Sequence, residues 1–236
     1  MGTRHEMRWG GVAGIAAVIV AIIARLMLGS VPAATDSTRT IALFLFDHRG
    51  QILAAALLYA VAVVLILWFG AALATAFRRA DETGDAPAVV FAGYVLICAV
   101  GFVAVSALAG MTYAMTAHPE LLLIVAGPYT AIAVLDVIAG IALALPMAAS
   151  AVAIAHTHVF PMWLAWFAAL VALVNVLSAI LVVSTTGGML APGSVLGGYV
   201  SGILAGLWVL TASGLLVREH LPVITARTAP PVVGHA

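Results

Sequence analysis

Asp136 is the only acidic residue inside the long apolar runs of this sequence. It lies near the middle of the run 122–149, and the only asparagine, Asn175, lies at a similar depth in the run 162–184. A carboxylate at the centre of a bilayer costs roughly 2.5–3.5 kcal/mol on insertion scales, so it normally faces a bundle interior or a water-filled cavity. Two interpretations stay open: Asp136 is a proton or cation relay, or it is a neutral or paired residue that fixes helix packing.

Two further side chains bear on Asp136. Asn175 could form a hydrogen bond with it across neighbouring helices. Arg25, in the outer part of the run 10–29, could reach toward the carboxylate or extend to the membrane surface. The three residues are the polar candidates within the apolar runs.

Two histidines, His156 and His158, flank a threonine in the turn after the run 122–149. A zinc site needs about four ligands, and no cysteine or further histidine lies nearby in sequence, so we interpret these as weak metal candidates in a polar turn. A membrane haem would need histidines at haem depth inside the bundle. The remaining histidines do not lie at mid-run positions: His5, His48, His118, His220 and His235.

Catalytic signatures are missing from the sequence. The chain has no lysine, which excludes a Walker-type loop, and it has no HExxH, CxxC or GxSxG motif. His118 and Glu120 could serve acid–base chemistry, but no other reactive residue gathers around them in sequence. We therefore expect neither an enzyme nor a bound cofactor.

The elements that must position these residues are helices in a membrane. Of the 236 residues, 65% are hydrophobic and 8% are charged, whereas soluble domains carry about 25% charged residues. A spanning helix needs about 20 apolar residues, and backbone amides in lipid must be satisfied within the helix. The sequence predicts an all-α polytopic bundle over residues 1–221, followed by a flexible cytoplasmic tail at 222–236. The six predicted spans are 10–29, 52–76, 88–110, 122–149, 162–184 and 195–217.

The arginines predict the orientation in a cell (inner or plasma) membrane. With the N-terminus inside, six of eight flanking arginines face the cytoplasm, and the positive-inside rule favours this N-in, C-in arrangement. The net charge is zero, which gives no reason to expect a nucleic-acid partner. The six arginines are Arg4, Arg8, Arg78, Arg79, Arg218 and Arg227.

The first run allows a second interpretation. Arg4 and Arg8, the apolar run and the small residues at 31–33 are similar to a secretory signal peptide with its cleavage site. The run is as long as a full span, so we predict a retained helix.

The longest outer segment is 30–50. Ser37 or Thr38 can cap a short helix there, which we expect to lie on the outer membrane interface. The apolar residues on one face of this helix are Ile41, Phe44 and Leu45.

Two features predict how spans pack or bend. Gly198, Gly202 and Gly206 recur every four residues, a spacing that lets another helix approach closely. Pro146 cannot donate a backbone hydrogen bond, so a kink near 142–146 is expected.

Several short stretches carry a resemblance to a known type of protein: 47–51 (DHRGQ), 68–70 (WFG), 78–81 (RRAD) and 159–166 (VFPMWLAW). Together they resemble uncharacterised multi-pass membrane proteins of actinobacteria, a family of unknown function. The resemblance spans most of the chain, and it implies the helical fold and no mechanism.

Two functions follow as hypotheses. The first is a non-catalytic accessory or structural subunit of a larger membrane complex, such as a lipid importer of the envelope or a respiratory assembly. It is motivated by small loops, few polar groups and many small residues. The second is a small secondary transporter or channel-like carrier that uses Asp136, and a polar cavity reaching that residue would favour it.

Overall fold

The computed structural model describes residues 2–184 and 200–218, and within these ranges the chain is helical with no strand. Six helices are long and apolar enough to cross a membrane, which confirms the predicted all-α polytopic bundle. Gly198 and the tail 222–236 lie outside the described residues. The elements in order are α1 (Gly2–Leu28), α2 (Thr38–Asp47), α3 (Arg49–Ala80), α4 (Ala86–Ala117), the 3-10 helix η1 (Pro119–Ile124), α5 (Ala126–Thr157), α6 (Met162–Ser184) and α7 (Val200–Val217).

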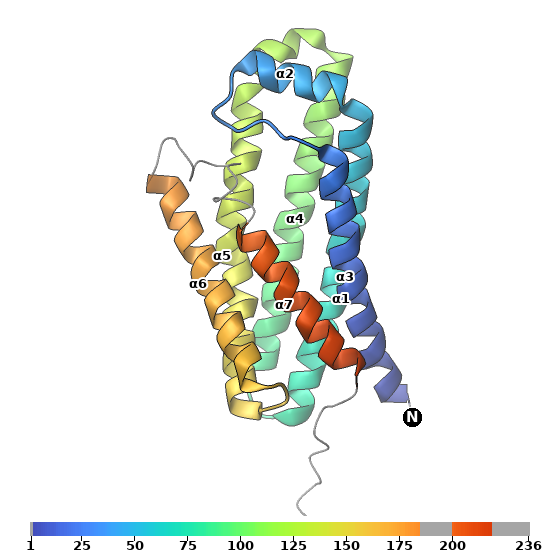
Figure 1. Cartoon of the computed structure of the whole chain (residues 1–236), viewed down its shortest axis with the longest axis vertical. Helices are drawn as coiled ribbons and strands as arrows, with labels where there is room; N and C mark the ends of the chain where they lie inside the picture. The colour runs from blue at the N-terminus through green and yellow to red at the C-terminus, as the bar shows by residue number, and fades with distance from the viewer. Residues whose placement is uncertain (1, 185–199, 219–236) are drawn as a thin grey trace, which may run out of the picture.

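The six long helices run side by side along the bundle, and α2 lies across one end (Figure 1). The start of α1 and the end of α7 lie at the opposite end, as six spans require. The two ends of the described chain therefore share a side of the membrane, while the side that faces the cytoplasm stays a prediction.

Three helices are longer than the sequence predicts. Each of α3, α4 and α5 has 32 residues, which corresponds to about 48 Å of helix. The apolar runs end earlier than the helices because the last turns of α3 and α5 carry arginine and histidine, residues that end a hydrophobic run but not a helix.

The short helix predicted in 30–50 is α2. The backbone N–H of Thr40 donates to Oγ of Ser37, 3.2 Å away, so Ser37 is the capping residue. Ile41 and Leu45 are fully buried in a small cluster formed with the ends of α3, α4 and α5. The hydroxyl of Tyr129 in α5 donates to the carbonyl of Pro32, 2.7 Å away, which attaches the preceding segment to the bundle.

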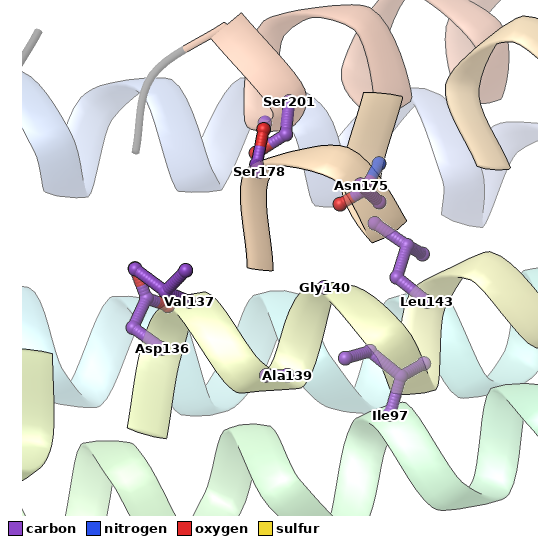
Figure 2. A pocket seen from close by; sticks show the side chains of 10 residues that line it. Ile97, Asp136, Val137, Ala139, Gly140, Leu143, Asn175, Ser178 and Ser201 are labelled. Atoms are coloured by element: carbon purple, nitrogen blue, oxygen red, sulfur yellow. The ribbon is translucent and has the colours of Figure 1, made fainter. Parts of the chain in front are cut away.

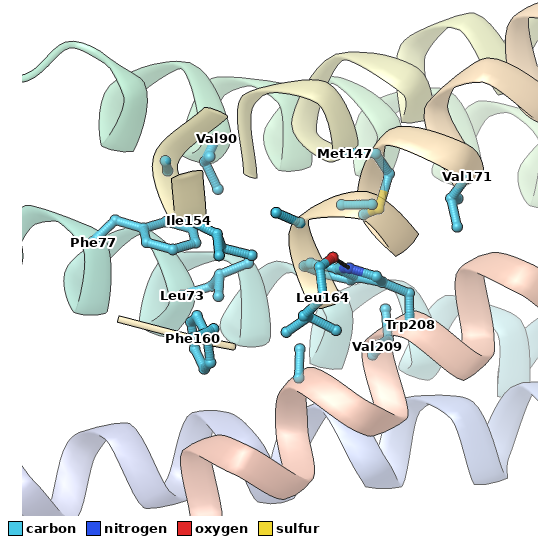
Figure 3. Close-up of a cluster of buried hydrophobic side chains, with 14 of the residues drawn as sticks. Leu73, Phe77, Val90, Met147, Ile154, Phe160, Leu164, Val171, Trp208 and Val209 are labelled. Carbon is cyan, nitrogen blue, oxygen red and sulfur yellow. Dashed lines mark hydrogen bonds between the residues drawn. The ribbon is translucent and has the colours of Figure 1, made fainter. Parts of the chain in front are cut away.

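The main core fills the other end of the bundle. Trp208 of α7 is fully buried, and its indole N–H donates to the carbonyl of Leu164 in α6, 3.2 Å away (Figure 3). Its ring also meets Phe69 of α3 edge-on, and Phe69 meets Tyr94 of α4 in the same way. One aromatic group thus joins α3, α4, α6 and α7.

Close helix approach occurs at glycines other than the predicted ones. A Cβ at Gly14 of α1 would overlap Oγ of Ser213 in α7, and one at Gly11 would lie 2.8 Å from the Ser213 carbonyl oxygen. By contrast, a Cβ at Gly202 would meet no atom within 4 Å, and one at Gly206 would make ordinary contact with Val18. Gly206 therefore lies toward α1 without a close contact, and the predicted close approach is not seen at Gly202 among the described residues; the tightest α1–α7 contacts lie at Gly11 and Gly14 of α1.

Pro146 lies inside α5, which continues through it as one helix. Its ring packs against α4 at Gly93, where a Cβ would lie 2.7 Å from Cδ of the proline. The glycine leaves room for the ring, so the proline serves as a contact between α4 and α5, and the bend near 142–146 stays a prediction.

Candidate functional site

A cavity of about 200 Å³ opens between four of the long helices. Its walls combine apolar side chains with one carboxyl, one amide and two hydroxyl groups (Figure 2). The lining residues are Ile97 of α4, five residues of α5 (Asp136, Val137, Ala139, Gly140 and Leu143), Asn175 and Ser178 of α6, and Ser201 and Gly202 of α7.

Asp136 supplies the only charged group in this lining. Its side chain is exposed to the cavity, whereas its neighbour Val137 is mostly buried in the contact between α5 and α6. Within the described part of the chain, no side chain forms a hydrogen bond or an ion pair with the carboxyl group. The paired form of the packing interpretation therefore has no partner residue in the described part of the chain, whereas a neutral Asp136 that fixes helix packing stays a prediction.

Asn175 of α6 is buried in the same wall, and it packs at Gly140, which lies one helical turn along α5 from Asp136. Its side-chain N–H donates to the carbonyl of Val171 in its own helix, 2.8 Å away. A Cβ at Gly140 would lie 3.1 Å from Oδ1 of Asn175, so the glycine allows α6 to approach α5 here. Asp136 and Asn175 line the same cavity, but the predicted hydrogen bond between them is not formed. The amide of Asn175 bonds to Val171 in its own helix.

Ser178 and Ser201 also line the cavity, and neither was predicted from the sequence. Figure 2 shows them across the cavity from Asp136. Ser178 lies three residues after Asn175, so helical spacing alone places it on the same face. Ser201 carries no such signal, because its position depends on how α7 crosses α6.

Arg25 does not reach the site. Its guanidinium Nη1 donates to the carbonyl of Gly29, 2.7 Å away, just beyond the end of α1. It is not among the cavity-lining residues, and the proposed ion pair with Asp136 is wrong. The side chain instead extends toward the end of its helix, the second of the two predicted possibilities.

The weak metal candidates lie at the other end of α5. His156 lines a separate cavity of about 230 Å³ together with Asp81 and Asp85, while His158 adopts φ 53° at the helix end. Among residues 2–184 and 200–218, no three His, Cys, Asp or Glu side chains gather closely enough to hold a metal ion.

The possible acid–base pair lies in the connection between α4 and α5. His118 Nδ1 lies 3.3 Å from a carboxylate oxygen of Glu120, and both side chains are more than half exposed. The two side chains are in contact, but both are exposed to solvent and line neither of the two cavities.

Comparison with known proteins identifies no relative: no family model, curated protein or solved structure matches this chain significantly. The resemblance to multi-pass membrane proteins of actinobacteria stays a prediction.

Proposed function

We propose that this integral membrane protein is a small carrier that exchanges a proton for a small monovalent cation at Asp136. The observation that carries this proposal is the polar cavity at Asp136, the feature that the carrier hypothesis requires. The accessory-subunit hypothesis requires no such cavity.

The charge of the lining supports a cation. Asp136 is an acid, and the lining contains no basic residue to balance it. An ionised carboxylate away from bulk water needs a counter-charge or a proton. Amide and hydroxyl oxygens from Asn175, Ser178 and Ser201 can complete the coordination of a bound cation.

The size of the cavity supports a small solute. The cavity has a volume of about 200 Å³. Pockets for drug-sized ligands have about 300–1,000 Å³, so a metal ion or a short alkylammonium fits better than a large organic molecule. The apolar wall from Ile97 and Leu143 suits an alkylammonium in particular.

The exchange step is balanced. The neutral carboxyl releases its proton to water as the cation enters, and the carboxylate then holds the cation as an ion pair. When the cation leaves, a proton from water restores the neutral acid. Both states are electrically neutral at the site, which lowers the penalty of keeping an acid within the membrane.

Proteoliposomes with a trapped pH dye test this function. Adding Na⁺ or K⁺ outside should drive protons out of vesicles that contain the wild-type protein, and Asp136→Asn should abolish the signal. Glu120→Gln removes one negative charge from an exposed position outside the cavity and is the matched control. Equal proton efflux from Asp136→Asn and wild type would refute the proposal.

The accessory-subunit hypothesis has its own test. Apolar side chains are exposed on all six long helices, but contact with lipid alone requires the same pattern, so they do not identify a protein partner. Purification from native membranes in mild detergent would recover a stable partner if the hypothesis is right. A lone protein with cation exchange activity would favour the carrier.

A further inference from the structure

The exposed surface of α3 changes character abruptly at Trp68. From Leu57 to Trp68 its large exposed side chains are apolar or aromatic: Leu57, Val61, Val64 and Trp68. After Trp68 the exposed side chains of the helix are Thr75, Arg78 and Arg79. Lipid-facing positions in hydrocarbon are apolar, so the change locates the end of the hydrocarbon on this helix.

Other exposed tryptophans lie near the same level. Gly10 of α1 packs against Ala72 and the Trp68 carbonyl, which brings Trp9 close to the level of Trp68. Trp163 and Trp166 flank Leu164 of α6, which is joined through Trp208 to Phe69. Indole rings favour the boundary between hydrocarbon and water, so three helices mark one boundary.

The opposite boundary lies at the start of α3. The guanidinium of Arg49 lies over the exposed ring of Tyr113 in α4, 5.7 Å from its centre. The 19 residues from Arg49 to Trp68 rise about 29 Å, which matches a hydrocarbon core of about 30 Å. The level of Arg49 and Tyr113 and the level of Trp68 thus lie one hydrocarbon thickness apart.

The amphipathic helix α2 lies at this second level. Its buried face holds Ile41 and Leu45, and its exposed face carries Leu43, Phe46 and Arg39. An exposed pair of large apolar side chains beside an arginine is typical of a helix that lies in a membrane interface.

We propose that the bilayer covers the bundle only from the α2 level to the tryptophan level, and that a helical foot projects beyond it into water. The foot comprises the last turns of α3 and α5 and the connection 81–85, where the exposed side chains include Thr75, Arg78, Arg79, Glu82 and His156. It holds the second cavity, with Asp81, Asp85 and His156, outside the hydrocarbon. On the lipid side, Leu43 and Phe46 of α2 enter the opposite leaflet boundary.

This placement also fixes the depth of Asp136. Pro146 packs at Gly93, next to Tyr94, which itself packs on Gly70 close to Trp68. Asp136 lies ten residues from Pro146 along α5, about 15 Å from the tryptophan level and so near the midplane. The placement rests on side-chain exposure and not on the proposed exchange function, so either can fail without the other.

Fluorescence quenching tests the tryptophan level in the wild-type protein. The chain is reconstituted into phosphatidylcholine vesicles whose acyl chains are brominated either near the headgroup or near the methyl end. Bromines near the headgroup should reduce tryptophan emission more than those near the methyl end. Stronger quenching by the deep bromines would overturn the placement.

Nitroxide labels test the foot and α2 separately. Cysteines are introduced one at a time as Thr75→Cys, Val61→Cys and Phe46→Cys, first with the buried Cys98 retained and then in a Cys98→Ser background. The label at 61 should collide mainly with oxygen, the label at 75 with a water-soluble nickel chelate, and the label at 46 should report headgroup depth. Lipid-like accessibility at 75, or bulk-water accessibility at 46, would contradict the proposal.

Discussion

Two regions of this bundle are built from the same small residues and differ in packing. At the contact of α1 with α3 and α7, glycines allow backbones and rings to touch, and the aromatic group around Trp208 fills the remaining space. Between α5, α6 and α7, a cavity remains open at Gly202 and exposes a carboxyl group. The first region holds the helices together, and the second leaves room for a ligand.

The difference teaches that glycine spacing does not by itself indicate a tight contact. Gly202 and Gly206 have the four-residue spacing of a packing motif, yet among residues 2–184 and 200–218 no atom lies within 4 Å of a Cβ placed at Gly202. At Gly11 and Gly14, which are three positions apart, α7 lies directly against α1. Whether a glycine lies in a tight contact depends on which residues of the neighbouring helix lie opposite it.

The largest effect is expected from removing the central ring of the packed region. Trp208→Ala deletes a fully buried indole and leaves the Leu164 carbonyl without its donor, so we predict a loss of about 3–5 kcal/mol of stability. Leu207→Ala, at an exposed neighbour on the same helix, should change little and is the control. Thermal unfolding in mild detergent measures the stability of both variants. Equal unfolding temperatures would contradict the claim that the region around Trp208 holds the helices together.

A matched pair of glycine substitutions comes next. Gly14→Leu forces a side chain into Ser213 and Phe69, and overpacking of this kind costs about 1–3 kcal/mol. Gly202→Leu grows into the cavity, so it should keep the unfolding temperature but reduce cation-driven proton efflux. A stable Gly14→Leu protein, or a Gly202→Leu protein with full exchange activity, would show that the two regions do not differ as described.

The smallest effect is expected at Ser213. Its hydroxyl is buried and has no hydrogen-bond partner, so its removal relieves a desolvation penalty. Ser213→Ala should therefore leave stability unchanged or raise it by up to about 1 kcal/mol. A clear drop in unfolding temperature would mean that the hydroxyl makes a stabilising contact in the membrane.

A further check concerns the first helix. Because Gly10, Gly11 and Gly14 fit α1 between α3 and α7, we predict that α1 is retained in the mature protein. Intact-mass measurement on protein purified from membranes decides this, and a mass that lacks residues 1–33 would support the signal-peptide interpretation instead.

The sequence predicts the spans well because apolar length is a local property of the chain. It also identifies Asp136 and Asn175, since polar residues stand out in apolar runs. It does not predict Ser201, the contact glycines of α1 or the hydrogen bond of Arg25 to Gly29, because each depends on where a distant helix crosses or ends. Helix ends were underestimated where polar residues continue an established helix, as at Arg78 and Arg79.

Infrared difference spectroscopy on Asp136 tests the central claim most directly. The carbonyl stretch of a protonated carboxyl group within the membrane is identified by its absence in Asp136→Asn. If Asp136 exchanges its proton for a cation, adding Na⁺ or methylammonium to reconstituted wild-type protein should remove this band and produce carboxylate bands. A carbonyl band that both cations leave unchanged, or carboxylate bands that persist without any cation, would contradict the exchange.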